Sequence, residues 1–300
     1  MSLNKLSKAD LHLLEVFVSV VEAGGFSAAQ VRLNVSTSTI SRQISQLETR
    51  LGLRLCSRGR GGFQLTNRGQ AVFRAANSLF SAVDEFQDSV AATKDQLTGQ
   101  LSLAVIDNWI ADQPGPLDRA LALFKEDAPE VTIDIHSLAP DDIEHAVLDG
   151  RIALGVGVFH RHKPGLFYEP IQEDPLELFC GKGHPLFGAS NIQPEDLRNT
   201  DLVRRAYLDE QQVAPLTANL PSTAQAHQIE GIAFLILSGR YVGYLPVHYA
   251  SRWTKLGLMQ SLLPQSHSMS TNIEIVTKRG LRRSSITEVF IQLLQEEING

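Results

Sequence analysis

The chain has 300 residues, of which 43% are hydrophobic and 20% are charged, and its net charge at neutral pH is −6. This composition is typical of a globular chain long enough for more than one domain, and it excludes a low-complexity or disordered protein. The N-terminus has no apolar signal sequence, and the apolar run at residues 232–237 is far too short to span a membrane. We therefore expect a cytoplasmic protein with no membrane partner.

Two helices are predicted at the start of the chain. Ser7 and Asp10 form a capping-box pattern before leucines and valines at helical spacing, and two glycines at 24–25 follow as a helix end. Ser27 and Gln30 form a second capping-box pattern. We expect Ala28, Ala29 and Val31, which are small, to pack closely in this second helix.

A third helix is predicted to begin after Ser36, which is a favourable N-cap residue. Leu33, Val35, Ile40, Ile44 and Leu47 are expected to form an inward-facing stripe. Two helices joined by a tight turn, with polar residues on the first turns of the second, are typical of a helix-turn-helix that reads the major groove of DNA. The residues expected to contact DNA here are Ser27, Ser36, Thr37, Ser38, Thr39, Ser41, Arg42 and Gln43. An ordinary helical hairpin with a polar surface is the alternative.

Arginines and glycines alternate directly after these helices. Arg58 and Arg60 lie among three glycines, and residues 64–66 resume an extended pattern. A glycine-rich turn carrying arginines is suited to DNA phosphates or to the minor groove, so we interpret it as a wing. Solvated loop arginines are the alternative.

The charge is distributed unevenly along the chain. Residues 1–74 contain ten Lys or Arg and four Asp or Glu, a balance of +6, which leaves −12 for residues 75–300. A basic N-terminal part on an acidic body favours nucleic-acid binding by the N-terminal part.

A long helix is predicted after Thr66, its expected cap. Its apolar residues recur at spacings of four and three over about three heptads, as in a coiled coil. We predict that this seam dimerises the protein; packing on the chain's own second domain is the alternative. The seam residues are Val72, Ala76, Leu79, Val83, Phe86 and Val90.

From residue 101 the pattern changes to short apolar runs that alternate with amphipathic segments. Strands are expected at 101–106, 131–135, 152–158, 176–180, 202–203, 241–245 and 273–276, and helices at 117–125, 141–148 and the C-terminus. This alternation predicts a parallel α/β sheet. Two such lobes would leave a cleft for a ligand near the carboxyl ends of the strands.

The segment from Leu11 to Thr66 resembles the N-terminal domain of the LysR-type transcriptional regulators. The matching residues are the helix with Phe17, Gly25-Phe26-Ser27-Ala28-Ala29, Val35-Ser36, Ser41-Arg42-Gln43-Ile44, Leu47-Glu48, Leu51-Gly52, Leu55, Arg58, Leu65-Thr66 and Gly69. Residues 183–186 and 243–246 resemble the effector domain of the same family less specifically. Thr37 departs from the family, which commonly has Gln there, and Cys56-Ser57 replaces the usual Phe-Glu.

The resemblance implies an α/β protein overall: an all-α winged helix-turn-helix, a long linker helix, and a two-lobed effector domain like type II periplasmic binding proteins. We assign these to residues 1–66, 67–93 and 94–300. It further implies a homodimer or homotetramer that binds a double-stranded DNA operator, responds to a small-molecule co-inducer without another cofactor, and contacts RNA polymerase. The effector-binding residues it implies are Asn108, Trp109, Ser137, Phe159, Tyr207 and Pro246. Each of these could equally be an ordinary loop or packing residue, and near Tyr207 the pair Arg204-Arg205 could equally anchor an acidic ligand or form surface salt bridges.

A small-ligand-binding protein or an enzyme without a DNA role is the alternative function. Gly155 and Gly157 lack the third glycine of a dinucleotide-binding motif, and the chain has no P-loop or H-E-x-x-H motif. His160 and His162, with His136, could ligate a metal, although solvated loop residues explain them better. Cys56 and Cys180 lack a C-x-x-C context, so we expect two thiols rather than a redox pair.

Overall fold

The computed structural model describes residues 6–59, 62–92, 97–107, 109, 115–205, 216–217, 220–280 and 283–300. These form two compact units: Met1–Gln87 with Leu148–Arg151, and Asp88–Val147 with Ile152–Gly300. We call them the head and the body.

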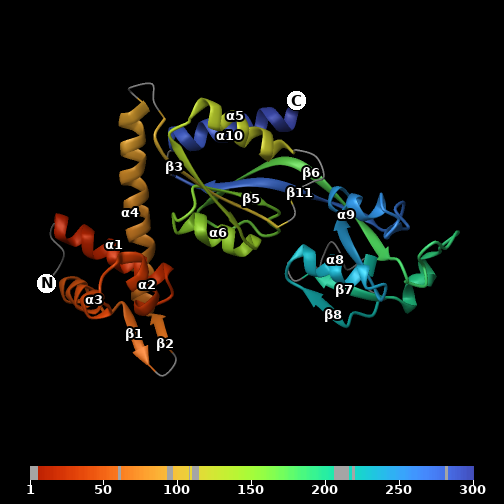
Figure 1. Ribbon diagram of the computed structural model, residues 1–300, viewed down its shortest axis with the longest axis horizontal. Helices are drawn as coiled ribbons and strands as arrows, with labels where there is room; N and C mark the ends of the chain where they lie inside the picture. The colour runs from red at the N-terminus through yellow and green to blue at the C-terminus, as the bar shows by residue number, and fades with distance from the viewer. Residues whose placement is uncertain are drawn as a thin grey trace. The chain divides into compact units, whose positions relative to one another are not determined.

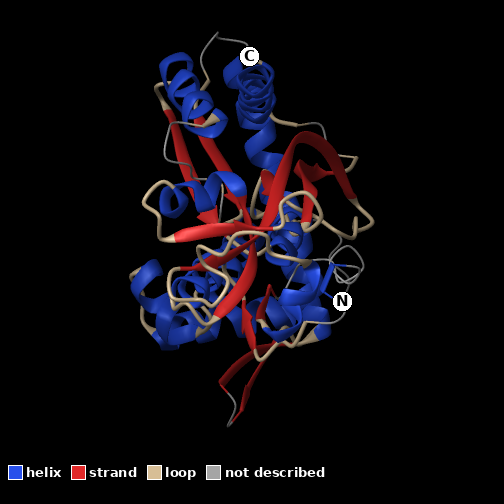
Figure 2. Ribbon diagram, turned by 90° about the vertical axis from the view of Figure 1, so that its right-hand side faces the viewer, coloured by secondary structure: helices blue, strands red, loops and turns tan. Residues whose placement is uncertain are grey.

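The head contains three short helices, a hairpin and a long helix (Figure 1). The helices are α1 (Lys8–Glu22), α2 (Phe26–Leu33), α3 (Thr37–Leu51) and α4 (Asn67–Ala92), and β1 (Cys56–Gly59) pairs antiparallel with β2 (Gly62–Leu65). Phe17, Ile40, Ile44 and Leu47 are buried at the centre of this unit, as an amphipathic pattern predicts. The hairpin extends away from the three helices (Figure 2), and it confirms the predicted strands of a wing.

Three of the four predicted helix starts in the head are confirmed, and one of them is Thr66, whose hydroxyl accepts a hydrogen bond from the Gly69 amide at the start of α4. Ser7 and Asp10 form a reciprocal capping box, and the Ser36 hydroxyl accepts a hydrogen bond from the Thr39 amide. The box predicted at Ser27 is wrong, because the N-cap of α2 is Gly25, two residues earlier, and the helix has no side-chain cap. Gly25 has a φ of +148°, and a Cβ there would lie 3.3 Å from the Phe63 side chain of the hairpin. A tertiary contact therefore determines where this helix begins.

The expected packing of three apolar residues in the head is also wrong. Ala28 is exposed on α2, where Val31 is 85% exposed, and Val35 is exposed in the turn before α3. The close approach of α2 to its neighbours uses Ala29, which is fully buried.

The long helix α4 packs one half of its apolar seam inside the head. Val72, Ala76 and Leu79 contact the head core, whereas Val83, Phe86 and Val90 are exposed. The first half of the seam is therefore used within the chain.

The body contains mixed α/β structure. Its strands are β3 (Gly99–Val105), β4 (Val131–Ser137), β5 (Leu154–Gly157), β6 (Leu166–Gly181), β7 (Asp201–Arg205), β8 (Ala224–Ala226), β9 (Tyr241–Pro246), β10 (Met259–Leu262) and β11 (Ser268–Lys278). Its helices are α5 (Pro116–Asp127), α6 (Pro140–Leu148), η1 (Pro194–Asn199), α8 (Ile229–Leu237), α9 (Val247–Thr254) and α10 (Ser285–Asn299). The strand order is β4-β3-β5-β11-β6-β9-β7-β8, and β10 pairs with β6.

The predicted parallel sheet holds only in part. β3 is parallel to β4 and β5, and β7 is parallel to β8 and β9, but β6 and β11 pair antiparallel with each other and with their neighbours. These two long strands run through both halves of the body, which we call lobe I (residues 97–147, 152–173 and 272–300) and lobe II (residues 174–271). In lobe I, α5 and α10 cover one face of the sheet and α6 covers the other (Figure 1).

No single described helix is both long and apolar enough to cross a membrane. The pair α1 and α2 reaches that length and hydropathy together, but it is bent by 120° at the break between the helices.

Candidate functional site

Hydroxyl groups gather at the start of α3. The Ser36 Oγ lies 2.8 Å from the Ser38 Oγ and 2.9 Å from the Thr39 Oγ1, and it accepts a hydrogen bond from the Thr39 amide. Ser36 and Ser38 are exposed, and Thr37 and Thr39 are half-buried. Because the first turn of a helix also presents backbone amides, this end of α3 offers donors to phosphate oxygens and to base edges.

The next turn of α3 divides its polar residues between two environments. Arg42 is exposed and forms no ion pair with any residue that the structure describes. Gln43 is half-buried, and its Nε2 lies 3.1 Å from the His12 Nε2 of α1. Ser41 is half-buried as well, and Ser27 is exposed on the first turn of α2.

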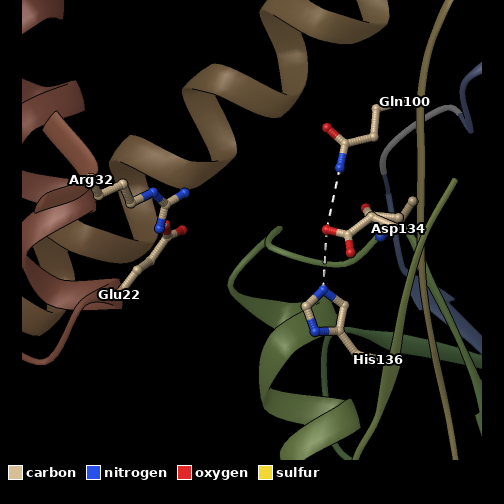
Figure 3. A network of polar contacts seen from close by, with 7 residues as sticks. Glu22, Arg32, Gln100, Asp134 and His136 are labelled. Atoms are coloured by element: carbon tan, nitrogen blue, oxygen red, sulfur yellow. Dashed lines mark hydrogen bonds and ion pairs between the residues drawn. The ribbon is translucent and has the colours of Figure 1, made fainter. Parts of the chain in front are cut away.

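Two head arginines hold the helices together. Arg32 pairs with Glu22 at 2.6 Å and so ties α2 to α1 (Figure 3). Arg50 of α3 donates to the buried Asp10 of α1 over 2.7 Å. The hydrogen bond from the Ser7 hydroxyl, followed by that from Arg50, lowers the pKa of Asp10 to about 2. Two of the arginines in the basic N-terminal part, Arg32 and Arg50, are therefore paired with carboxylates of the head itself. Arg42 is a further arginine of α3, and it is exposed.

The hairpin is attached to α3 through a carboxylate. Glu48 Oε1 accepts hydrogen bonds from the backbone amides of Leu55 and Cys56, at 2.7 and 3.3 Å. This contact fixes the start of the hairpin beside the third helix. Arg58 lies in β1, although its side chain is outside the described part of the chain, as is all of Arg60.

Four of the six residues predicted to bind an effector lie in the described part of the chain. Trp109 packs against the core of lobe I, Phe159 is buried with its ring 5.6 Å from that of Tyr168, and Pro246 is buried at the start of α9. Ser137 is exposed at the end of β4. Asn108 and Tyr207 lie outside the described residues. Three of these side chains thus take part in packing, and their contact with an effector stays a prediction.

A charged contact that sequence reasoning missed joins the two lobes. The Asp107 carboxylate of lobe I accepts a hydrogen bond from Arg205 Nη2 at 2.9 Å and another from the Ile229 amide at 2.6 Å, and both donors belong to lobe II. Burial lowers the pKa of Arg205 to about 10, so the guanidinium stays charged at neutral pH. Asp107 directly follows one predicted strand, and Arg205 comes two residues after another, which was the available signal. The sequence could not indicate that these two strand ends meet.

A second contact lies where β6 passes between the lobes. His248 Nδ1 of α9 lies 3.1 Å from the buried carboxylate of Asp174 in β6. The negative charge of Asp174 also helps to keep Arg205 protonated. The junction between the lobes therefore carries several charges close together.

The histidines considered as metal ligands have other contacts. His162 stacks on Tyr168 and lies 3.0 Å from a Glu274 oxygen, while His136 lies 3.2 Å from Asp134, which also accepts a hydrogen bond from Gln100 (Figure 3). Within the described ranges, no group of three or more His, Cys, Asp or Glu side chains could hold a metal ion.

The glycine and cysteine motifs are explained by packing. A Cβ at Gly155 would lie 2.1 Å from the Ile143 Cγ2 of α6, so this glycine permits close helix-to-sheet packing. Cys56 and Cys180 are both buried and lie in different units, and burial raises the pKa of Cys180 to about 11.

Comparison with known proteins gives matches over both units. Residues 11–70 match the family described as "Bacterial regulatory helix-turn-helix protein, lysR family", and residues 94–299 match "LysR substrate binding domain". The HTH-type transcriptional activator BauR of Pseudomonas aeruginosa is 36% identical over 293 residues, which cover 97% of this chain and 96% of the relative. The probable transcriptional regulator LrrA of Synechococcus elongatus is 31% identical over 58% of each chain. These relatives are regulators, not enzymes.

Solved structures share the same fold. CbnR in complex with its target DNA has a TM-score of 0.65 and 22% identity, and the match covers 97% of this chain and all of that one. ArgP from Mycobacterium tuberculosis has a TM-score of 0.68 at 17% identity, over 99% of this chain and 98% of that one. The chain therefore belongs to the LysR family and is a DNA-binding transcriptional regulator with an effector-binding domain.

Proposed function

We propose that this regulator places the N-terminal half of α3 in the major groove of its operator. Arg42 reads base edges or phosphates, the hydroxyls of Ser36, Ser38 and Thr39 contact the backbone, and the hairpin reaches an adjacent phosphate or the minor groove. The observation that carries this proposal is the exposed Arg42 beside a hydroxyl-rich helix start in the basic part of the chain. The half-buried Gln43, which contacts His12, contributes by holding α3 on α1.

The operator is bound by a homodimer or by a tetramer built from it. Val83, Phe86 and Val90 remain exposed on α4 after the rest of the seam has packed in the head. An exposed apolar stripe on a long helix favours pairing with the same helix of a second subunit. A two-fold pair of heads would match a two-fold symmetric operator.

A small molecule bound between the lobes changes the geometry of the oligomer and, with it, contacts with RNA polymerase. It can do so only if it binds one arrangement more tightly than the other. BauR is described as a transcriptional activator, which supports activation by this chain as well. A regulator of this bacterial family meets its DNA in the cytoplasm, and we place the protein there.

Selection from a pool of random DNA duplexes tests this proposal, because the enriched duplexes themselves reveal the operator sequence. Full-length protein is expected to enrich a two-fold symmetric site with half-sites about one helical turn apart, or a multiple of that spacing. Recovery of a random pool, with binding that depends only on salt, would contradict sequence-specific recognition.

A further inference from the structure

The junction of the two lobes contains an anion site that the chain itself occupies. Arg205 and the Ile229 amide are both supplied by lobe II, whereas the carboxylate that they bind, Asp107, comes from lobe I. A group from one lobe thus fills a site built entirely by the other.

This site is constructed for a negative charge. The Arg205 side chain is only 5% exposed, and a buried guanidinium is costly unless a carboxylate or similar anion faces it. The side chain of Gln228, the N-cap residue of α8, makes no capping hydrogen bond. The Asp107 carboxylate instead accepts a hydrogen bond from the first backbone amide of the helix, that of Ile229. The positive end of the helix and the arginine therefore act on the same carboxylate.

The environment of Arg205 identifies the groups that any ligand would meet. Asp174 on β6 contributes a negative charge at the guanidinium in addition to that of Asp107. Tyr249 on α9 is a further neighbour, and burial raises its pKa, so it stays neutral at neutral pH. Glu230 on α8 and Arg252 on α9 act in turn on Tyr249. Asp107 already binds the Arg205 guanidinium, and Asp174 places a second negative charge near it. An anionic ligand that reaches Arg205 would therefore replace Asp107.

We propose that Asp107 is a tethered substitute for the effector, and that the effector is a small organic carboxylate which takes its place on Arg205 and the Ile229 amide. This inference rests on the proposed function, in which the effector binds between the lobes. The exchange breaks the direct bond between the lobes at Asp107 and so couples ligand chemistry to lobe geometry. A tethered group competes at a high effective concentration, so wild-type protein binds a simple carboxylate weakly.

Removal of the tethered carboxylate tests this exchange. Full-length Asp107→Ala protein is titrated with acetate and, separately, with acetamide, at constant ionic strength, and thermal unfolding is recorded. Acetate is expected to raise the Tm of the variant and to bind it at least about tenfold more tightly than wild type, because the competitor is gone. Acetamide, which has the same shape without the charge, is expected to have no effect.

Two further variants make the result specific. Asp118→Ala removes a carboxylate that accepts a hydrogen bond from the Gly115 amide at another helix start, without an arginine partner among the described residues, and its acetate response is expected to equal that of wild type. The double variant Asp107→Ala with Arg205→Gln is expected to lose the response. Equal acetate binding by Asp107→Ala and wild type would overturn the proposal.

A variant that does not fold also gives an answer. If Asp107→Ala is unfolded in chloride, acetate must restore its folding and acetamide must not, and failure of acetate to do so would overturn the proposal. The result is separable from that of the DNA selection. Protein that enriches an operator but shows no acetate response retains the proposed function and loses only this inference.

Discussion

Replacement of Phe86 by serine should weaken the dimer without weakening the head. Full burial of a phenylalanine side chain contributes about 1.5–3 kcal/mol. Phe86 is 68% exposed in the single chain, so roughly two thirds of that, about 1–2 kcal/mol, remains to be gained at a partner. Two symmetry-related copies give about 2–4 kcal/mol, which corresponds to a roughly 30- to 900-fold increase in the dimer Kd.

Sedimentation velocity over a concentration series measures this change. Urea unfolding of the same protein, followed by circular dichroism, checks that the head is intact, because Phe86 buries little within it. Val31→Ser is the matched control, since Val31 is also apolar and exposed but lies on α2, away from the seam. A dimer Kd for Phe86→Ser within about threefold of wild type would refute the assignment of this stripe to dimerisation, since that difference is below 1 kcal/mol.

Three further outcomes are expected. The pKa of Asp10 is lowered to about 2 from an ordinary value near 4. The contribution of its ionised carboxylate to head stability is therefore complete above about pH 4 and is lost as the pH falls toward 2. Asp10→Asn should abolish that part of the pH dependence in acid unfolding curves. Gly181→Ala should destabilise lobe II by about 1–3 kcal/mol or more, since the new Cβ would lie 2.1 Å from the Ile236 carbonyl oxygen. Gly115→Ala is the control, because a Cβ there would have no neighbouring atom closer than the Asp118 Oδ2 at 3.9 Å. This control should unfold at the same urea concentration as wild type. Leu79→Asp should lower head stability as well as dimerisation, because Leu79 packs on the head core; a monomer with unchanged urea stability would contradict this packing.

The head could be predicted closely because its signals are local. The Ser7 and Ser36 caps and the stripe of Ile40, Ile44 and Leu47 depend on residues within a few positions of each other. The start of α2 could not be predicted, since it depends on Gly25 approaching Phe63, which is distant in sequence.

The limits of the α4 and body predictions have the same physical origin. Periodicity indicated an apolar seam, but it does not indicate which surface covers each turn, so the packing of Val72 and Ala76 within the head was not foreseen. Apolar runs indicated the strands but not the antiparallel direction of β6 and β11. The contact of Asp107 with Arg205 spans 98 positions and two lobes, and no pattern in the sequence encodes such a pairing.

The affinity of Arg42→Ala for the selected duplex tests the central claim most directly. Fluorescence anisotropy at fixed salt compares wild type, Arg42→Ala and Arg198→Ala, a control that removes the same charge from an exposed position on η1 of the body. If α3 enters the groove, Arg42→Ala should weaken binding by about 1–3 kcal/mol, the usual range for an arginine contact to a base, and Arg198→Ala should bind as wild type does. Equal affinity of Arg42→Ala and wild type for the selected duplex would contradict recognition through this helix.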